Sequence, residues 1–454
     1  MAIEEILQQQ RAYFTTGITR SHDFRIAALQ RLRMAINTHR GQIEEALKAD
    51  LNKSTYETYM TELGLAMEEI NYQIRHLSSW MRTRRVPVGL GQFPARSTVM
   101  VEPYGVVLIM APWNYPVLLS LQPLIGAISA GNCAIVKPSA YAPHASQAIA
   151  DIIAEAFEPE HIAVIQGGRE ENTTLLKQRF DYLFFTGSVA VGKVVMEAAA
   201  KHLIPMTLEL GGKSPVIVDS SADIDLAAKR IAFGKIVNAG QTCIAPDYVL
   251  VHESIKEELI SRLGTWITTF LGQAPLDNPD YPKIITAARH QHLLGLLQGC
   301  TIRCGGQARF PSIEPTIVEC SSWDVPIMQE EIFGPILPVF SYSSLPQALV
   351  QIAAHDKPLA LYLFTRDPAV EKLVLQNLSF GGGCINDTIM HVASLKVPFG
   401  GVGASGLGSY HGKASFETFS HRKGILKKGR WLDLPFRYHP YKERNLRLMR
   451  KLLD

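Results

Sequence analysis

Cysteine is scarce in this sequence. Its 454 residues include six cysteines, none of them in a paired CxxC motif, so neither a disulfide framework nor a zinc site is indicated. Such sparse use of cysteine is typical of a reducing compartment. The opening residues, MAIEEILQQQRAYF, also lack the basic segment and the apolar core of a secretory signal. We therefore expect a cytosolic protein.

The sequence also lacks a long uninterrupted hydrophobic run. The longest uncharged stretch, residues 104–136, contains APWNYP as well as Gly126 and Gly131, and these interruptions do not suit a membrane-spanning helix. We expect this stretch to form a buried strand, a loop, a helix and a second strand.

A strong charge of either sign is missing from most of the chain. The formal net charge is +3, which excludes a broad field that would attract nucleic acid. The tail differs, because eleven lysines and arginines stand against three acidic residues from His421 onward. Its end, NLRLMRKLLD, has the spacing of a partly amphipathic helix. Two interpretations stay open: the tail packs on a partner subunit, or it contacts an anionic membrane surface.

What the sequence does contain is a regular alternation of strand-like and helical runs. Strand-like runs such as GVVLIMAP, NCAIVKPS and YLFFTGS are separated by helical stretches such as HASQAIADIIAEAFE, and a second alternating set covers residues 216–400. At 454 residues and 47% hydrophobic composition, the chain exceeds the size of a single core. The alternation predicts an α/β fold with two Rossmann-like lobes built from parallel βαβ units.

Three side chains in loops could carry chemistry. Cys243 lies in NAGQTCIAP, although a lone cysteine is more often interior packing. Glu209 ends the apolar run of LELGGKSP and precedes two glycines, where it could act as a base or form a salt bridge. Asn114 follows the strand GVVLIM in APWNYP, where its amide could point into a cleft or make an Asx turn.

The stretch FFTGSVAVGK has the order strand, glycine turn, helix. Gly187, Ser188 and Gly192 open the predicted helix, and a helix N-terminus in this setting can hold a pyrophosphate. The spacing departs from GxGxxG, so an ordinary strand-to-helix turn is the alternative.

Taken together, the motifs resemble those of the aldehyde dehydrogenase superfamily over nearly the whole chain. They are PWNYP, KPS, FTGS, LELGGKSP, GQTC, EEIFGP and PFGGVGASGLGSYHG. RFDYLFFTGSVAVGKVVMEAAAKHL and GSYHGKASFETFSHRK resemble the class 3, or fatty aldehyde dehydrogenase, branch. The resemblance implies a homodimer that oxidises medium- or long-chain aliphatic aldehydes to carboxylic acids with NAD or NADP, with aromatic aldehydes as a further candidate class.

The resemblance also implies roles for individual residues. Cys243 is the nucleophile, Glu209 the general base and Asn114 an oxyanion donor. The substrate residues are Tyr115 and Thr242. The cofactor residues are Trp113, Lys137, Gly187, Ser188, Gly192, Leu210, Glu331 and Phe333.

One position departs from the family pattern. Members that prefer NAD commonly have KPSE, whereas this chain has Ala140 in place of the glutamate. An acidic residue there binds the ribose hydroxyls and repels a 2′-phosphate. We therefore predict that NADP is accepted alongside NAD, with Lys137 available as a phosphate partner.

The expected boundaries follow the motifs. Residues 1–80, with an opening helical pair, and 101–211 form the cofactor-binding domain, and residues 212–400 form the catalytic domain. Residues 81–100 and 401–454 form a small β oligomerisation arm and the C-terminal tail, because RTRRVPVGLGQFPARSTVMVEPYG combines basic residues, prolines and a short alternating run.

Three alternatives to hydrolytic aldehyde oxidation fit the sequence less well. An acylating or semialdehyde dehydrogenase would pass the acyl group to another thiol, but retention of Glu209 favours hydrolysis. A non-catalytic protein with the same fold would not need Cys243, Glu209 and Asn114 together. A thiol protease needs a histidine paired with its cysteine, and none of the fourteen histidines lies in such a motif.

Overall fold

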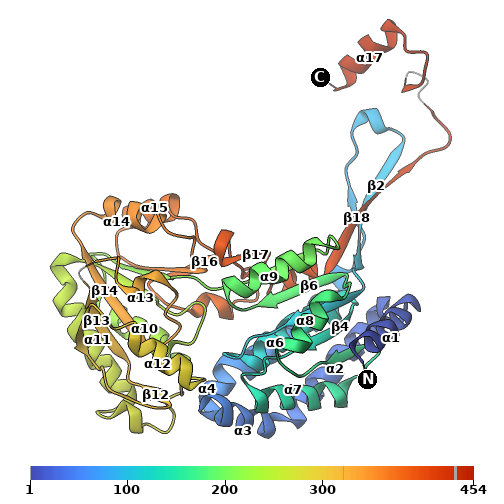
Figure 1. The fold of residues 1–454 in the computed structure, drawn as a ribbon. Helices are drawn as coiled ribbons and strands as arrows, with labels where there is room; N and C mark the ends of the chain where they lie inside the picture. Colours follow the sequence, from blue (N-terminus) through green and yellow to red (C-terminus); the bar gives the residue numbers. More distant parts are fainter. Residues whose placement is uncertain (1, 321, 434–436, 454) are drawn as a thin grey trace.

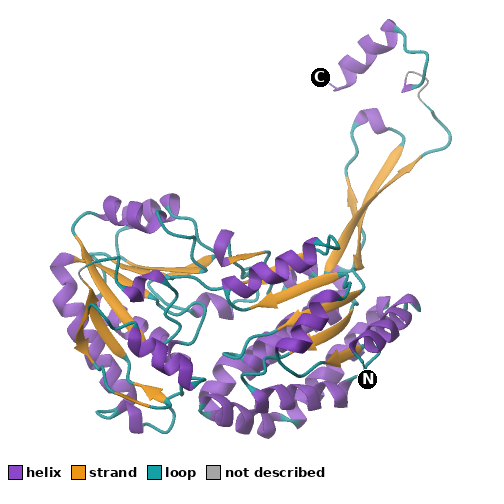
Figure 2. Cartoon of the chain, in the orientation of Figure 1, coloured by secondary structure: helices purple, strands orange, loops and turns teal. Residues whose placement is uncertain are grey.

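The computed structural model describes residues 2–320, 322–433 and 437–453. Two α/β lobes lie side by side, and a thin arm projects from the first lobe toward the C-terminus (Figure 1). Helices cover the faces of both large sheets (Figure 2). This architecture confirms the predicted fold class of two α/β lobes with a small β arm.

The first lobe is built on a six-stranded sheet in the order β17-β7-β6-β3-β4-β5. All neighbours are parallel except β17, which runs antiparallel to β7. The strands are β3 (Val106–Met110), β4 (Cys133–Lys137), β5 (Ile162–Val164), β6 (Tyr182–Thr186), β7 (Met206–Glu209) and β17 (Gly406–Leu407). The helices after β3 are α6 (Pro116–Ala130), α7 (Pro143–Ala156), α8 (Arg169–Lys177), α9 (Val189–Ala200) and α16 (Lys413–Thr418).

The uncharged stretch 104–136 lies at the centre of this lobe. Every residue of β3 and β4 is buried, as expected for parallel strands covered on both faces. The helix between them, α6, is almost wholly buried, and its Gly126 leaves no room for a Cβ beside Ser415 and Phe419. The predicted order of strand, loop, helix and strand is confirmed.

The N-terminal region is more divided than predicted. Instead of one helical pair, residues 2–80 form five α-helices: α1 (Ile3–Thr15), α2 (His22–Thr38), α3 (Arg40–Leu51), α4 (Thr55–Thr58) and α5 (Gly64–Trp80). The breaks come from capping residues that the apolar spacing does not reveal. Ser21 and Ser54 cap the starts of α2 and α4, and Asn52 ends α3 in a left-handed conformation.

The second lobe has a seven-stranded sheet in the order β10-β13-β14-β9-β8-β15-β16, in which β10 alone is antiparallel to its neighbour. The strands are β8 (Pro215–Val218), β9 (Tyr248–His252), β10 (Cys300–Cys304), β13 (Thr316–Cys320), β14 (Ile336–Tyr342), β15 (Ala360–Phe364) and β16 (Gly382–Ile385). The helices are α10 (Ile224–Ile236), α11 (Lys256–Leu271), α12 (Ala287–Gly295), α13 (Pro326–Gln329), α14 (Leu345–Ala353) and α15 (Pro368–Asn377). A short hairpin joins β11 (Ala308–Arg309) to β12 (Ser312–Ile313).

Two cysteines of this lobe correct an expectation. Cys300 and Cys320 form a disulfide, with Cα atoms 4.8 Å apart, whereas the sequence indicated no disulfides. The two residues lie directly opposite each other on β10 and β13. The two cysteines are 20 residues apart in sequence, and the pairing of β10 with β13 brings them together. No local motif such as CxxC therefore marks them.

The arm is a three-stranded antiparallel sheet in the order β1-β2-β18, and helix α17 follows it. The elements are β1 (Arg84–Val86), β2 (Ala95–Pro103), β18 (Ser420–Lys428) and α17 (Glu443–Leu453). The preceding segment 401–419, which our predicted boundaries group with the tail, packs on the first lobe through β17 and α16. No helix within the described residues combines the length and apolarity needed to span a membrane.

Candidate active site

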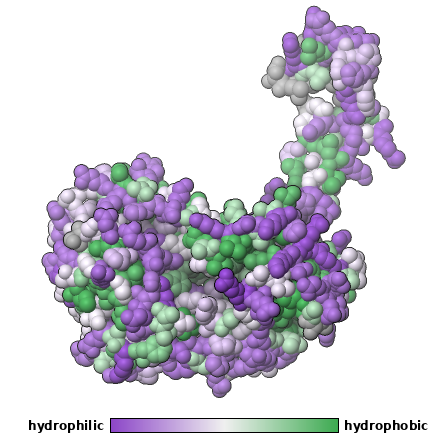
Figure 3. Space-filling model, in the orientation of Figure 1, coloured by the Kyte–Doolittle hydropathy of each residue, from purple (hydrophilic) through white to green (hydrophobic). Residues whose placement is uncertain are grey.

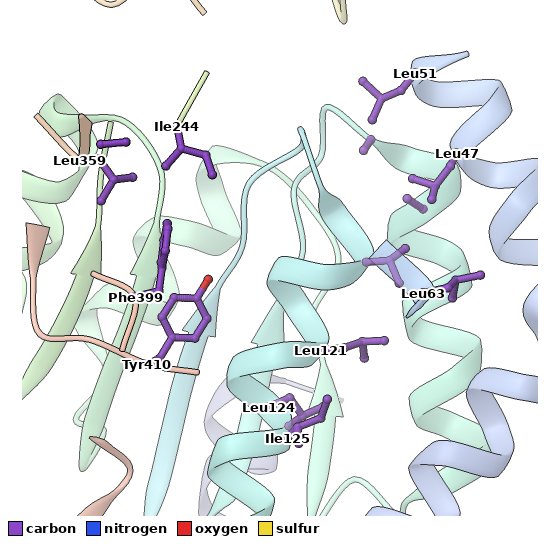
Figure 4. Close-up of a cluster of buried hydrophobic side chains, with 14 of the residues drawn as sticks. Leu47, Leu51, Leu63, Leu121, Leu124, Ile125, Ile244, Leu359, Phe399 and Tyr410 are labelled. Atoms are coloured by element: carbon purple, nitrogen blue, oxygen red, sulfur yellow. The ribbon is translucent and has the colours of Figure 1, made fainter. Parts of the chain in front are cut away.

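A cavity lies between the two lobes. It is lined by Glu209 and Tyr115 of the first lobe and by Cys243 and Thr242 of the second. The rest of the wall is mainly apolar and includes Met60, Leu65, Leu118, Phe233, Val237, Ile244, Leu359, Ile389, Val392, Phe399 and Tyr410. Figure 4 shows Phe399 and Tyr410 side by side, close to Ile244 and Leu359. Residues distant in sequence thus form one apolar chamber with a thiol and a carboxyl group in its wall.

Cys243 lies in a tightly folded loop between α10 and β9. The turn before it, Val237–Gly240, holds Asn238 and Ala239 at a positive φ of 50°, a conformation that is costly for residues other than glycine. The thiol is free, and burial, with Glu331 and Glu209 as further causes, raises its pKa. The resting thiol is therefore protonated and needs a proton acceptor before it can attack a carbonyl carbon.

Glu209 is the last residue of β7, at the carboxyl edge of the first sheet. Its side chain is buried, and neither carboxyl oxygen has a hydrogen-bond partner among the described residues. Burial raises its pKa well above the usual range for glutamate. A carboxyl group with a raised pKa and free oxygens is suited to take a proton from a thiol or a water in the cavity.

Asn114 lies four residues after β3, behind the cavity wall. Its side-chain Nδ2 donates to the carbonyl of Gln241 at 3.0 Å, which places the amide beside the loop of Cys243. The Asn114 carbonyl accepts from Asn238 Nδ2 at 2.8 Å and from Lys53 Nζ at 3.0 Å. The amide has a second hydrogen, so it retains a donor for an oxyanion.

The two predicted substrate residues contact each other across the lobes. Tyr115 Oη and Thr242 Oγ1 are 2.6 Å apart, and both line the cavity beside Cys243. The tyrosine is buried. Because the hydrogen bond uses only its hydroxyl group, the face of its ring stays available for packing in the cavity wall.

Several predicted cofactor residues also meet between the lobes. The rings of Trp113 and Phe333 are 5.5 Å apart at 77°, and Phe333 has a positive φ of 47°. Glu331 lies so close to Gly211 that a Cβ there would overlap its carboxylate. Burial, with Asp247 as the next cause, raises the pKa of Glu331 to about 8.

The remaining cofactor residues lie at the carboxyl ends of parallel strands of the first sheet. Lys137 ends β4, and Gly187 and Ser188 follow β6. Ser188 caps the N-terminus of α9, and Gly192 in that helix packs against Leu210. A strand-edge crevice with a helix N-terminus is where α/β sheets bind nucleotides, so these residues fit a dinucleotide.

Comparison with known proteins agrees with this arrangement. The family model described as the aldehyde dehydrogenase family matches residues 1–425. The chain belongs to the aldehyde dehydrogenase family. The expected resemblance is therefore confirmed, and the protein is a nicotinamide-dependent aldehyde dehydrogenase.

Individual relatives indicate the branch of the family. The 4,4′-diaponeurosporen-aldehyde dehydrogenase of Staphylococcus aureus is 48% identical, with 97% of each chain covered. Human aldehyde dehydrogenase family 3 member B1 is 43% identical (98% of this chain, 96% of that one). The dimeric NADP-preferring aldehyde dehydrogenase of Canis lupus familiaris is 42% identical (96% and 98%). The substrate-bound structure of Staphylococcus aureus AldH has a TM-score of 0.97 at 46% identity, with both chains fully covered. The predicted class 3 branch is confirmed.

In the dehydrogenase, main-chain carbonyls hold the side chain of Lys137. Its Nζ already donates to the carbonyls of Gly167 at 2.7 Å and Pro138 at 2.8 Å, and burial lowers its pKa. Ala140, three residues on, is exposed. A 2′-phosphate near Ala140 would therefore be exposed to solvent. The Lys137 ammonium is already bonded to main-chain carbonyls.

Sequence reasoning missed the residues that join the two catalytic loops. Asn238 and Gln241 lie within the nucleophile motif but were not singled out, and their positions in NAGQTC were the one available signal. Lys53 and Glu62 lie in the N-terminal helical region, and nothing in the sequence marks them. In the structure, Lys53 and Asn238 donate to the Asn114 carbonyl, and Lys53 also contacts Glu62. The Gln241 main-chain carbonyl accepts from the Asn114 amide.

Proposed function

We propose that the dehydrogenase oxidises apolar aldehydes through a thioester on Cys243 that water then hydrolyses. The supporting observation is that Glu209, whose carboxyl oxygens have no hydrogen-bond partner in the described part of the chain, shares one apolar cavity with Cys243. Two groups that need each other for chemistry are thus enclosed away from bulk water.

The roles follow from the positions of the groups. Glu209 removes the thiol proton, and the Cys243 sulfur bonds to the aldehyde carbon. The Asn114 amide and the Cys243 backbone N–H donate to the resulting oxyanion. A nicotinamide cofactor, held by residues that include Glu331 and Phe333, would supply the acceptor for the hydride that leaves this carbon. After releasing the thiol proton to solvent, Glu209 takes a proton from a water molecule, and the resulting hydroxide attacks the thioester. The Cys243 thiolate leaves and takes that proton back from Glu209, so the acid is released with the thiol restored.

The cavity wall supports a medium- or long-chain aliphatic substrate. Apart from the reacting groups, its side chains are mainly apolar, and no lysine or arginine among the described residues lines it. The aldehyde in the name of the Staphylococcus aureus relative favours the same class. Aromatic aldehydes are a further candidate class, since Tyr115, Phe399 and Tyr410 offer ring faces.

The first experiment mixes the protein with decanal and follows the absorbance of reduced nicotinamide, with Cys243→Ala in parallel. Turnover by the wild type that is lost in the variant is the expected result. Adding coenzyme A and assaying acyl-CoA separates hydrolysis from the acylating alternative. Silence of the wild type toward aliphatic and aromatic aldehydes would contradict the substrate proposal.

We further propose that both NAD and NADP are used. The position that carries a glutamate in NAD-preferring members is here the exposed Ala140, so no carboxylate at that position repels a 2′-phosphate. The name of the canine relative includes NADP preference. Turnover with NAD and none with NADP would exclude this proposal.

We propose a homodimer that forms through the arm. β18 exposes Ile425 and Leu426 on opposite faces, and β2 exposes Met100, which leaves apolar side chains for a second copy to cover. The canine relative is named dimeric. Measurement of the molar mass by light scattering, with Leu426→Lys, tests this: the wild type should have the mass of two chains and the variant that of one.

The tail has two candidate partners. Helix α17 forms as predicted, and its described side chains Leu446, Leu448 and Met449 are exposed beside basic residues. Mixed polar and apolar residues surround the tip of the arm (Figure 3). Packing on the partner subunit is our proposal, and peripheral contact with an anionic membrane is the alternative. Co-sedimentation with anionic vesicles at low salt would favour the membrane, and failure to co-sediment would exclude it.

A further inference from the structure

A buried ion pair lies behind the proposed oxyanion donor. Lys53, in the loop between α3 and α4, and Glu62 have no exposed side-chain surface, and Lys53 Nζ lies 2.6 Å from Glu62 Oε1. Burying two charges costs free energy that mutual attraction repays only when further hydrogen bonds satisfy both groups. The groups that hydrogen-bond to Lys53 and Glu62 therefore indicate which part of the structure the ion pair stabilises.

Glu62 is bonded to the start of α6. Its second oxygen accepts from the backbone N–H groups of Val117 at 2.9 Å and Leu118 at 3.1 Å. These groups have no partner within their own helix, and a carboxylate is favoured at the positive end of the helix dipole. Glu62 lies in a π-helical turn, Tyr59–Leu63, a rare feature that is frequent at functional sites.

Lys53 is bonded to the residues just before α6. Its ammonium donates to the Asn114 carbonyl at 3.0 Å and lies 4.0 Å from the centre of the Tyr115 ring. The pair thus holds the chain on both sides of Tyr115, from Asn114 to Leu118.

The same carbonyl links this segment to the nucleophile loop. Asn238 Nδ2 donates both to the Asn114 carbonyl at 2.8 Å and to the Gln241 carbonyl at 3.1 Å. The Gln241 carbonyl in turn accepts from the Asn114 amide. Two loops from different lobes are therefore joined by hydrogen bonds at Asn114, in addition to the bond between Tyr115 and Thr242.

We infer that Lys53 and Glu62 are positioning residues that fix the Asn114 amide relative to Cys243. The inference rests on the proposed role of Asn114 as oxyanion donor. Neither residue of the pair lines the cavity, so both act through the segment that they hold. A donor must lie within hydrogen-bonding distance of the oxyanion, and small displacements of reacting groups carry large losses in rate.

A double-mutant cycle of Lys53→Met and Asn114→Ala tests the inference in the full-length protein. We expect Lys53→Met to lower kcat with decanal between about 10- and 100-fold. The KM for cofactor should not change. In the Asn114→Ala background, Lys53→Met should cause little further loss, because the amide that it positions is gone. The isotope effect with 1-deuterated decanal should rise in both single variants, since formation and collapse of the oxyanion become slower.

Two further variants guard against loss of folding. Lys53→Met with Glu62→Gln removes both charges and keeps an oxygen that can accept from α6, and it should show the same reduced kcat with a higher Tm than Lys53→Met alone. The matched control is Arg25→Met. Arg25 is buried in α2 and donates to the carbonyls of Thr19 and of Ser129, which lies at the end of α6 opposite to Asn114. It should lower Tm and leave kcat unchanged.

The outcomes are distinguishable. Equal losses from Lys53→Met in the wild-type and Asn114→Ala backgrounds would overturn the inference, as would an unchanged kcat in folded Lys53→Met. If Asn114→Ala itself left kcat unchanged, the oxyanion role in the proposed function would be wrong instead.

Discussion

The interlobe site and the arm use the same kinds of side chain in opposite ways. At the site, Glu209, Lys53 and Glu62 are all buried. Among the described residues, Glu209 has no hydrogen-bond partner for its carboxyl oxygens, whereas Lys53 and Glu62 form an ion pair with each other. Along the arm and tail, basic and apolar side chains are exposed, so water already solvates each charge. A single buried charged group can change the reactivity of the site strongly. A single exposed charge contributes little, so exposed charges affect binding or stability only when many act together.

The largest difference between the site and the arm is expected for substitution of the nucleophile. Cys243→Ala should lower turnover with decanal by more than roughly 10⁴-fold, because loss of a nucleophile removes the covalent route entirely. Reduced nicotinamide formation measures this. The matched control is Cys304→Ala in β10, a half-buried free thiol outside the cavity, which should retain wild-type turnover. Turnover by Cys243→Ala near that of the control would contradict a thioester mechanism.

Glu209→Gln should lower steady-state turnover by about 10²- to 10⁴-fold. Because burial raises the pKa of Glu209, the basic form becomes more abundant as pH rises, so wild-type kcat should increase with pH through that raised pKa. The amide cannot titrate, and the variant should lose this limb of the profile. A pH series of initial rates measures it, and an identical pH profile in the variant would assign the base to another group.

Ala140→Glu should lower kcat/KM for NADP by about tenfold or more, because the new carboxylate faces the 2′-phosphate. The value for NAD should stay unchanged or improve. Ala140→Gln, of the same size without the charge, is the control that separates repulsion from bulk. Parallel assays with the two cofactors measure the ratio, and equal losses in both variants would show a steric effect only.

The smallest effect is expected at the tail. Arg447→Glu with Arg450→Glu reverses two exposed charges of α17, which lies beyond the arm and away from the two lobes (Figure 1). Turnover with decanal should stay within about twofold of the wild type. The double reversal Lys177→Glu with Lys372→Glu, on exposed helix faces of the two lobes, is the control for net charge. A large loss in the α17 variant alone would show that the tail reaches an active site, and the contrast between the two regions would fail.

Local patterns in the sequence allowed much of the fold to be predicted. Apolar runs such as GVVLIM and NCAIVK became buried parallel strands, since strands covered on both faces need continuous apolar residues. The five-helix N-terminal region and the disulfide between Cys300 and Cys320 were not predicted. Capping geometry decided the first and strand register the second, and neither has a strong local signature.

The sequence by itself determined the order of the motifs and the side chains available for chemistry. The thiol, the carboxyl group and the amide of the family pattern each lie in a short contiguous motif, which can be recognised without the structure. Only the tertiary structure decided how these groups meet. Glu209 has a raised pKa because the lobes exclude water from it, and Lys53 reaches the Asn114 carbonyl across 61 positions of sequence. Burial and contacts between distant residues arise from packing of the whole chain, so no local spacing encodes them.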